Sequence, residues 1–241
     1  MVANNTDMDW YDVTCCDYCG SSQQTVYLES NTPRWYGERP LRLVSCDDCG
    51  LVFASPRPEI KQLYTHYLAG DDDAKSVVER KLNRPNVRDI HRKHTRNAID
   101  FLGYPPKRLF DMGCGAGTTL MAAQELGIET WGNDVNKVAV DMLNAEGHNV
   151  QLGFKNELTL PSKHFDIILN FDYLEHSYTP MADLKKCFDL LVAGGVMYLK
   201  TLYLGCPSHL EKGEAWQLFG IGHFYFFTPE MLISMIESCG F

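Results

Sequence analysis

The sequence predicts an α/β protein in which a doubly wound, mostly parallel sheet follows a small cysteine-rich module. Three observations support this prediction. From Arg108 onward, short apolar runs alternate with helical patterns, which is typical of a parallel sheet covered by helices on both faces. A glycine-rich loop follows the first of these runs, and five of the nine cysteines lie within the first fifty residues.

The cysteine-rich module is expected to span residues 1–58 and to hold a metal ion. It contains two C-x-x-C-G knuckles, in which the cysteines are Cys16, Cys19, Cys46 and Cys49. The glycine after each pair tolerates the left-handed turn that points two thiolates at one ion. Four thiolates suit tetrahedral zinc and leave no position for a water, so we expect a structural ion. Cys15 is an alternative ligand, but the spacing favours Cys16.

Residues 59–106 are expected to form a helical linker or lid. Apolar residues at helical spacing predict a helix over Glu59–Leu68, Gly70–Asp73 predicts a break, and Val77–Leu102 predicts a polar helix. Seven lysines and arginines lie between Arg80 and Arg96. We interpret this basic stretch as a solvated helix face.

The sheet is predicted to have five strands with helices between most of them. The strands are Arg108–Met112, Glu129–Asn133, Asn149–Leu152, Phe165–Asn170 and Val196–Leu202, and the helices cover Thr118–Leu126, Asn136–Glu146 and Met181–Leu191. A further helix is expected to begin at Thr228, because threonine is a good N-cap and Pro229 suits the first helical position.

The strongest chemical signal is the loop after the first strand, where Gly113, Gly115 and Gly117 follow Asp111. Glycines let a ligand approach the backbone closely, and the amides that open the next helix favour a carboxylate or a phosphate. The spacing G-x-G-x-G differs from the dinucleotide fingerprint G-x-G-x-x-G, which disfavours a pyrophosphate ligand. Asp134 ends the second strand, where a carboxylate can accept the hydroxyls of a ribose.

Composition and charge restrict the class of protein. Of the 241 residues, 45% are apolar and 22% are charged, which is ordinary globular usage and excludes a disordered or fibrous chain. No apolar run approaches the roughly 18 to 20 residues that a membrane span needs, and the polar opening differs from a signal peptide. We therefore expect a soluble, cytoplasmic protein. The net charge of −9, with nine acidic and four basic residues in positions 1–60, disfavours nucleic acid as a partner.

Several motifs together resemble class I S-adenosylmethionine (SAM)-dependent methyltransferases from Leu109 onward. These motifs are Asp111–Gly117, Asp134, Phe165–His176, Leu190–Gly195 and His223–Glu230. The Leu-Glu-His sequence that ends at His176 and the segment from Trp216 to Thr228 resemble the ubiquinone-biosynthesis O-methyltransferase-like branch. The two cysteine knuckles are similar to the zinc-ribbon starts of bacterial methyltransferases from sugar, polysaccharide and natural-product pathways.

The resemblance implies a Rossmann-like methyltransferase domain over residues 107–241 that binds SAM, behind a zinc ribbon. It implies that the three loop glycines surround the methionine part of SAM, that Asp111 lies beneath them and that Asp134 binds the ribose. It further places Gly153 and Phe154 at the adenine, and Asn170 and Phe171 at the sulfonium. Phe154 and Phe171 are equally compatible with a place in the core.

Two histidines are candidates for the general base that a hydroxyl acceptor requires. His176 and His223 qualify because a neutral imidazole titrates in the right range. Each also has a structural interpretation: His176 as a residue at the start of a helix that holds a loop, and His223 as a hydrogen-bonded residue among aromatic side chains.

We expect a SAM-dependent methyltransferase that acts on a small-molecule or saccharide acceptor, at oxygen. One alternative is a zinc-ribbon RNA methyltransferase of the rRNA guanine type, which the acidic ribbon disfavours. Another is a SAM-binding regulator or assembly subunit without turnover. The family pattern closes the sheet with a sixth and a seventh strand after the helix at Thr228, and we expect the sequence as far as Phe241 to lack both. A bare sheet edge favours association, including homo-oligomers.

Overall fold

A computed structural model describes residues 9–33, 40–67, 71–154, 157–220 and 222–241. The chain divides into two compact units. The ribbon unit comprises the described parts of residues 1–66, 174–185 and 201–241, and the sheet unit comprises those of 67–173 and 186–200. None of the helices in these described ranges combines the length and the apolar character that crossing a membrane requires.

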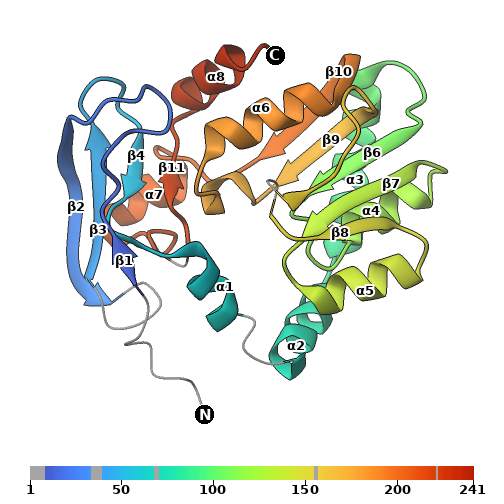
Figure 1. Ribbon diagram of the computed structural model, residues 1–241, viewed down its shortest axis with the longest axis horizontal. Helices are drawn as coiled ribbons and strands as arrows, with labels where there is room; N and C mark the ends of the chain where they lie inside the picture. Colours follow the sequence, from blue (N-terminus) through green and yellow to red (C-terminus); the bar gives the residue numbers. More distant parts are fainter. Residues whose placement is uncertain (1–8, 34–39, 68–70, 155–156, 221) are drawn as a thin grey trace. The chain divides into compact units, whose positions relative to one another are not determined.

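The sheet unit contains five parallel strands in the order β10-β9-β6-β7-β8 (Figure 1). Their bounds are β6 Arg108–Met112, β7 Glu129–Asp134, β8 Asn149–Leu152, β9 Phe165–Phe171 and β10 Leu191–Lys200. The chain order reverses between β6 and β9. Open α/β sheets bind ligands beside such a reversal, at the carboxyl ends of the strands.

Helices cover both faces of this sheet, as the doubly wound prediction requires. The helices are α2 Asp71–Leu82, α3 Val87–Leu102, α4 Thr118–Gln124, α5 Lys137–Ala145 and α6 Pro180–Leu190. Helices α3, α4 and α5 bury apolar side chains against Leu109, Ile167 and Leu169 on one face. The last turn of α6 packs on the other face, where Leu190 meets Phe110 and Ile168. Burial on both faces explains why the central strands β6 and β9 are mostly apolar.

Two predictions about the elements were wrong. The fifth strand runs over Leu191–Lys200 and not Val196–Leu202, because Leu191 already pairs with Phe165 before a register shift that spans Gly194. The helical stretch of the linker is not broken at 71–73, which belong to α2, while Gly70 lies outside the described residues. Within residues 71–102, all of which are described, the helical stretch is interrupted between α2 and α3, where Asn86 has a left-handed φ of 59° that asparagine tolerates.

The ribbon unit is built on an antiparallel sheet in the order β11-β4-β3-β2. Its strands are β2 Gln24–Pro33, β3 Pro40–Cys46, β4 Val52–Ala54 and β11 Tyr225–Phe226, and a separate pair joins β1 Trp10–Tyr11 to β5 Arg57–Pro58. The unit also contains α1 Ile60–Tyr67, the 3₁₀ turns η3 Leu174–His176 and η4 Gly213–Ala215, and the helices α7 Pro207–Lys212 and α8 Pro229–Ser238. The predicted cap of α8 is confirmed, since Met231 N–H donates to Thr228 Oγ1 over 3.2 Å.

A buried arginine joins the three chain segments of the ribbon unit. Arg57 donates to the Tyr11 hydroxyl over 3.1 Å and to the Tyr178 carbonyl over 3.1 Å. Its guanidinium also lies 4.7 Å from the ring centre of Tyr178 and 5.6 Å from that of Tyr225. Aromatic faces and hydroxyls therefore surround this cation and connect residues 11, 178 and 225.

Candidate functional site

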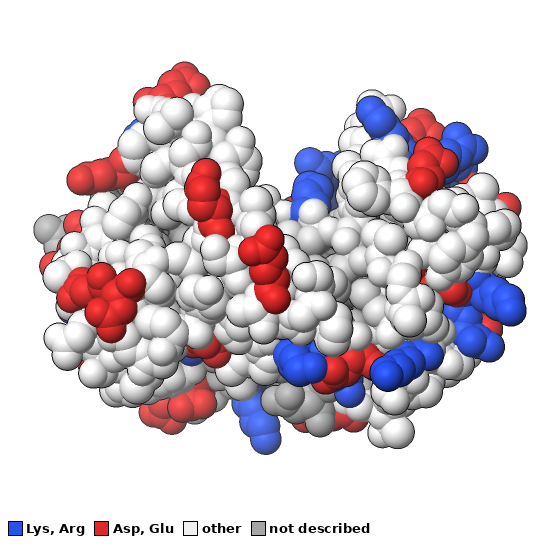
Figure 2. Space-filling model, turned by 90° about the horizontal axis from the view of Figure 1, so that it is seen from above, with Lys and Arg blue, Asp and Glu red and all other residues white. Residues whose placement is uncertain are grey.

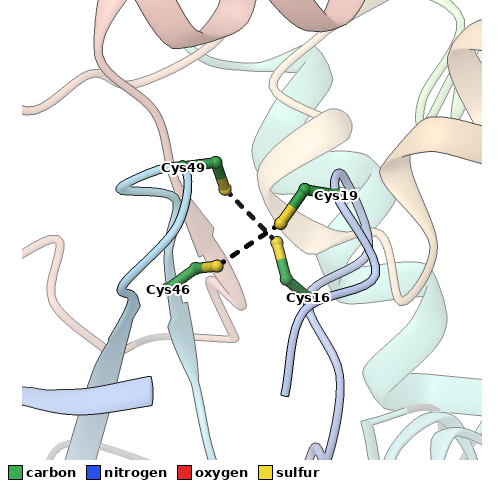
Figure 3. A group of neighbouring side chains, drawn as sticks. All are labelled: Cys16, Cys19, Cys46 and Cys49. Atoms are coloured by element: carbon green, nitrogen blue, oxygen red, sulfur yellow. Dashed lines mark hydrogen bonds between the residues drawn. The ribbon is translucent and has the colours of Figure 1, made fainter. Parts of the chain in front are cut away.

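The four predicted cysteine ligands converge on one point (Figure 3). Cys16 Sγ lies 3.6 Å from Cys49 Sγ, Cys19 Sγ lies 3.5 Å from Cys46 Sγ, and all four sulfurs lie within 4.8 Å of one another. The two knuckles have the same hydrogen bond, from the N–H after each pair back to the carbonyl of its first cysteine. Gly20 and Gly50 provide this N–H at left-handed φ angles of 76° and 79°, which confirms their predicted role.

The geometry of this cysteine cluster fits zinc. A tetrahedral ion with Zn–S bonds of about 2.3 Å separates its sulfurs by about 3.8 Å, close to the distances seen here. With four protein ligands, such an ion has no open position and is structural. Cys15 is exposed and lies outside the cluster. Burial raises the pKa of the Cys16 thiol to about 11, so this thiol must lose its proton when a metal binds.

The glycine loop between β6 and α4 adopts a conformation that only glycine adopts readily at three positions. Gly113, Gly115 and Gly117 all have left-handed φ angles, of 71°, 55° and 75°. A Cβ atom on Gly113 would lie 2.5 Å from the Tyr173 ring, and one on Gly117 would lie 2.1 Å from Leu143. Both the backbone conformation and the packing therefore require glycine here.

Asp134 holds this loop at the end of β7. Its Oδ2 accepts the Gly115 N–H over 2.8 Å, and its Oδ1 accepts the Asn136 N–H over 2.8 Å. A carboxylate offers about four lone-pair positions, so about two remain for further donors. The two hydroxyls of a ribose could donate one hydrogen bond to each of these two positions.

Asn170, at the end of β9, provides a second indication of a ligand. Its side chain is fully buried, and its Oδ1 has no hydrogen-bond partner among the described residues. Buried acceptors without partners are costly and often await a ligand or a water. The sheet unit therefore has spare acceptors at the ends of β7 and β9.

Asp111 is buried beneath the loop as a carboxyl group that titrates near neutrality. Burial, together with the charge of Asp134, raises its pKa to about 7 against the opposing effects of the Thr119 hydroxyl and the Lys81 charge. A cationic ligand beside this carboxyl would favour its ionised form.

The ligand-free protein is expected to lose stability as the pH rises from about 4 to about 7. The folded Asp111 carboxyl holds its proton up to about pH 7, whereas the unfolded one, with a pKa near 3.8, has lost it. Each pH unit between these values therefore costs up to about 1.4 kcal/mol of folding free energy. Urea unfolding of the wild type and of Asp111→Asn from pH 4 to pH 8 measures this contribution. Identical pH slopes for the two proteins would contradict the assignment.

The remaining predicted cofactor contacts lie at the ends of the neighbouring strands. Gly153 follows β8, and its N–H donates to the Asp134 carbonyl over 3.0 Å. Phe154 comes next in the chain, and its N–H donates to Glu157 Oε2 over 3.0 Å. Phe171 ends β9 and is partly buried, with its ring centre 5.6 Å from that of Tyr198. The carboxyl ends of four adjacent strands thus bring all the predicted contacts to one edge of the sheet.

Two histidines that the sequence analysis missed lie at the same edge. His91 Nδ1 lies 2.8 Å from the hydroxyls of both Thr118 and Thr119, and His94 Nδ1 lies 3.3 Å from the Tyr198 hydroxyl. Burial and, next, the charge of Lys200 lower the pKa of both rings, so both are neutral at pH 7. Their spacing of three residues on a predicted helix was the signal that could have indicated a shared face.

The two predicted bases, His176 and His223, lie together in the ribbon unit with ring centres 4.6 Å apart. His176 Nδ1 lies 2.9 Å from the Gly222 carbonyl, and His223 Nδ1 lies 2.8 Å from the Leu218 carbonyl. Because a carbonyl only accepts, each Nδ1 carries the hydrogen, and the lone pair of the neutral ring is on Nε2. A Glu175 oxygen lies within 4.8 Å of nitrogens of both rings, so the three groups are close enough to ligate one metal ion.

Residues 82–241 match the family model described as a methyltransferase domain. The chain belongs to this methyltransferase family. The resemblance to class I SAM-dependent methyltransferases is thereby confirmed, and the match contains the glycine loop, Asp134 and the two proposed bases, His176 and His223.

Relatives of this methyltransferase-family chain agree with that assignment. It is 34% identical over 146 residues to a ubiquinone biosynthesis O-methyltransferase of Cereibacter sphaeroides (strain ATCC 17025 / ATH 2.4.3), covering 55% of this chain and 59% of the relative. The chain thus spans less than two thirds of the length of the curated relatives it matches.

Two solved structures share the fold. A SAM-dependent methyltransferase from Archaeoglobus fulgidus has a TM-score of 0.53 at 20% identity, with 76% of this chain and 75% of that chain covered. The plantazolicin methyltransferase BpumL in complex with S-adenosylhomocysteine (SAH) has a TM-score of 0.58 at 15% identity, with 75% of each chain covered. The predicted Rossmann-like methyltransferase fold is confirmed.

Proposed function

We propose that this protein transfers the methyl group of SAM to a hydroxyl oxygen of a small-molecule or saccharide acceptor. The observation that carries the proposal is the glycine loop with Asp111 and Asp134 at the ends of β6 and β7, in a chain of the methyltransferase family. Oxygen as the methylated atom is supported by the similarity to ubiquinone biosynthesis O-methyltransferases.

The sheet unit has the groups that would hold SAM. Asp134 would accept the ribose hydroxyls, the glycine loop would surround the methionine part, and the ionised Asp111 would favour its positive charge. Gly153 and Phe154 would lie at the adenine, and Asn170 and Phe171 at the sulfonium. When bound, SAM supplies a methyl group on a good leaving group, so the protein mainly binds and orients the acceptor.

A hydroxyl acceptor must lose a proton, and His176 and His223 are the proposed bases. Hydrogen bonds from Nδ1 to backbone carbonyls fix both rings with the lone pair on Nε2. A neutral imidazole in this tautomer can accept a proton near pH 7. Glu175, which accepts a 2.7 Å hydrogen bond from the Thr201 hydroxyl, can stabilise the charged ring that results.

The charge on the face shown in Figure 2 favours a small acceptor over RNA. On the face shown in Figure 2, acidic side chains predominate over the ribbon unit, and basic and acidic side chains are mixed over the sheet unit. This face has no continuous basic area of the kind that binds a phosphate backbone.

Methyl-labelled SAM tests the function directly. The protein is incubated with labelled SAM and separate pools of phenols, sugars, nucleotide sugars, polysaccharide and ribosomal RNA, and the product is examined by NMR for a methyl ether. Label in a methyl ether of a small molecule or saccharide supports the proposal. Label in RNA, with activity that falls steeply as salt rises, would replace it with the RNA alternative. Calorimetric binding of SAM with no label in any pool would favour a regulator without turnover.

Loss of either proposed base is expected to slow the reaction without weakening cofactor binding. His176→Ala and His223→Ala should each lower kcat by about 10²- to 10⁴-fold, the usual contribution of a general base. The acidic limb of the pH profile of kcat should shift or disappear. His209→Gln is the control. His209 also lies in the ribbon unit, but its ring contacts Trp216 and Phe219 and is not one of the proposed bases. Unchanged kcat in both alanine variants would leave the two rings with a structural role only.

A further inference from the structure

Lys81, in the last turn of α2, lies directly over the glycine loop of the sheet unit. Its Nζ is 3.0 Å from the position that a Cβ atom would take on Gly115. The sequence analysis placed this residue in a solvated basic stretch. Lys81 is exposed like Lys75 of the same helix, but its ammonium reaches the glycine loop, whereas Lys75 pairs with Glu79 at 3.9 Å on the surface.

Apolar packing holds α2 in this position. Val78 is buried in a small cluster with Ala116 of the glycine loop and Ala139 of α5. Leu82 and Met142 pack against the same cluster. The place of Lys81 is therefore set by the helix that carries it and does not depend on its own charge.

The loop itself has few donors left for an anionic ligand. The N–H groups of Gly113, Cys114 and Gly115 donate to Asn133 and Asp134, and that of Gly117 donates to the Cys114 carbonyl. A carboxylate that enters the loop therefore needs another donor. The Lys81 ammonium is in reach of the loop, and among the described residues no acidic side chain forms an ion pair with it.

We propose that Lys81 binds the carboxylate of the amino-acid end of the cofactor and so positions that end in the glycine loop. The inference rests on the proposed function, because it takes SAM as the ligand of the loop. An ammonium and a carboxylate form a charge-assisted hydrogen bond, which is about twice as strong as a neutral one. Helix α2 would thus contribute to cofactor binding as well as to the linker.

Calorimetry with two product analogues tests the proposal without any methyl transfer. The ligands are S-adenosylhomocysteine and its decarboxylated form, which keeps the nucleoside, the thioether and the amino group. In Lys81→Met, the Kd of S-adenosylhomocysteine should rise about 10- to 100-fold, while that of the decarboxylated ligand should stay within about twofold of the wild type. Lys81→Arg should restore most of the lost affinity, and Lys75→Met should change neither Kd.

Three results would overturn the proposal, and they separate it from the proposed function. Equal affinity of the wild type and Lys81→Met for S-adenosylhomocysteine would show that Lys81 does not bind the cofactor, while the cofactor site itself would still stand. Tighter binding of both ligands by Lys81→Met would mean that Lys81 competes with the ligand for Asp111 and Asp134. Failure of the wild type to bind S-adenosylhomocysteine would remove the cofactor site itself, and with it both the proposed function and the role of Lys81.

Discussion

Serine in place of Cys16 or Cys46 is expected to abolish zinc binding and to unfold the ribbon unit. Both cysteines are almost fully buried, and they belong to different knuckles that a single ion would join. Binding of zinc to four thiolates provides about 10 to 16 kcal/mol in small zinc domains, and this free energy stabilises the fold. A sheet of four short strands cannot replace a contribution of that size.

The neighbouring cysteine offers a matched control. Cys15 is exposed and lies outside the cluster, so Cys15→Ser should keep about one zinc per chain and an unchanged thermal midpoint. Elemental analysis and thermal denaturation of the three variants measure both effects. Full retention of zinc by Cys16→Ser, or less than about half an equivalent in the folded wild type, would contradict the four-thiolate site.

Alanine in place of Asp134 is expected to weaken cofactor binding by about 100-fold or more. Two ribose hydroxyls that donate to a charged acceptor contribute roughly 1.5 to 3 kcal/mol each. The same substitution removes the two hydrogen bonds that hold the loop, from the N–H groups of Gly115 and Asn136. Ligand contacts and the shape of the loop are therefore lost together.

A graded variant and a surface control separate these effects. Asp134→Asn keeps one acceptor oxygen and should lose less affinity for S-adenosylhomocysteine than the alanine variant. Asp141→Ala, which removes an exposed partner of Lys137 on α5, should bind like the wild type. Calorimetry measures the affinities, and thermal denaturation shows whether each variant is folded. Wild-type affinity in both Asp134 variants would contradict the assignment of the ribose site.

Local sequence patterns predicted much of the sheet unit. The strands β6 and β8 have the predicted bounds, and β7 and β9 extend one residue further. For β6 and β9 the reason is that mostly buried strands have little freedom to shift. The left-handed turns at the two knuckle glycines, Gly20 and Gly50, were predicted for the same kind of reason. At these positions the backbone conformation depends on the residue itself and its nearest neighbours.

Long-range contacts could not be predicted in this way. The pairing of β11 with β4 places Tyr225 opposite Phe53. The surroundings of Arg57 combine residues from three parts of the chain, and the approach of Lys81 to Gly115 depends on the packing of Val78 on Ala116. None of these contacts leaves a periodic pattern in the sequence.

The sequence by itself determined four of the five strands of the sheet unit, the position of the glycine loop and the four cysteines, because each depends on residue type and short spacing. Only the tertiary structure decided which distant side chains meet. It brought His176 to His223, Lys81 to the glycine loop, and residues 225–226 to the edge of the ribbon sheet. The physical reason is that such contacts depend on how whole helices and strands pack, and many different residues are compatible with the same short pattern.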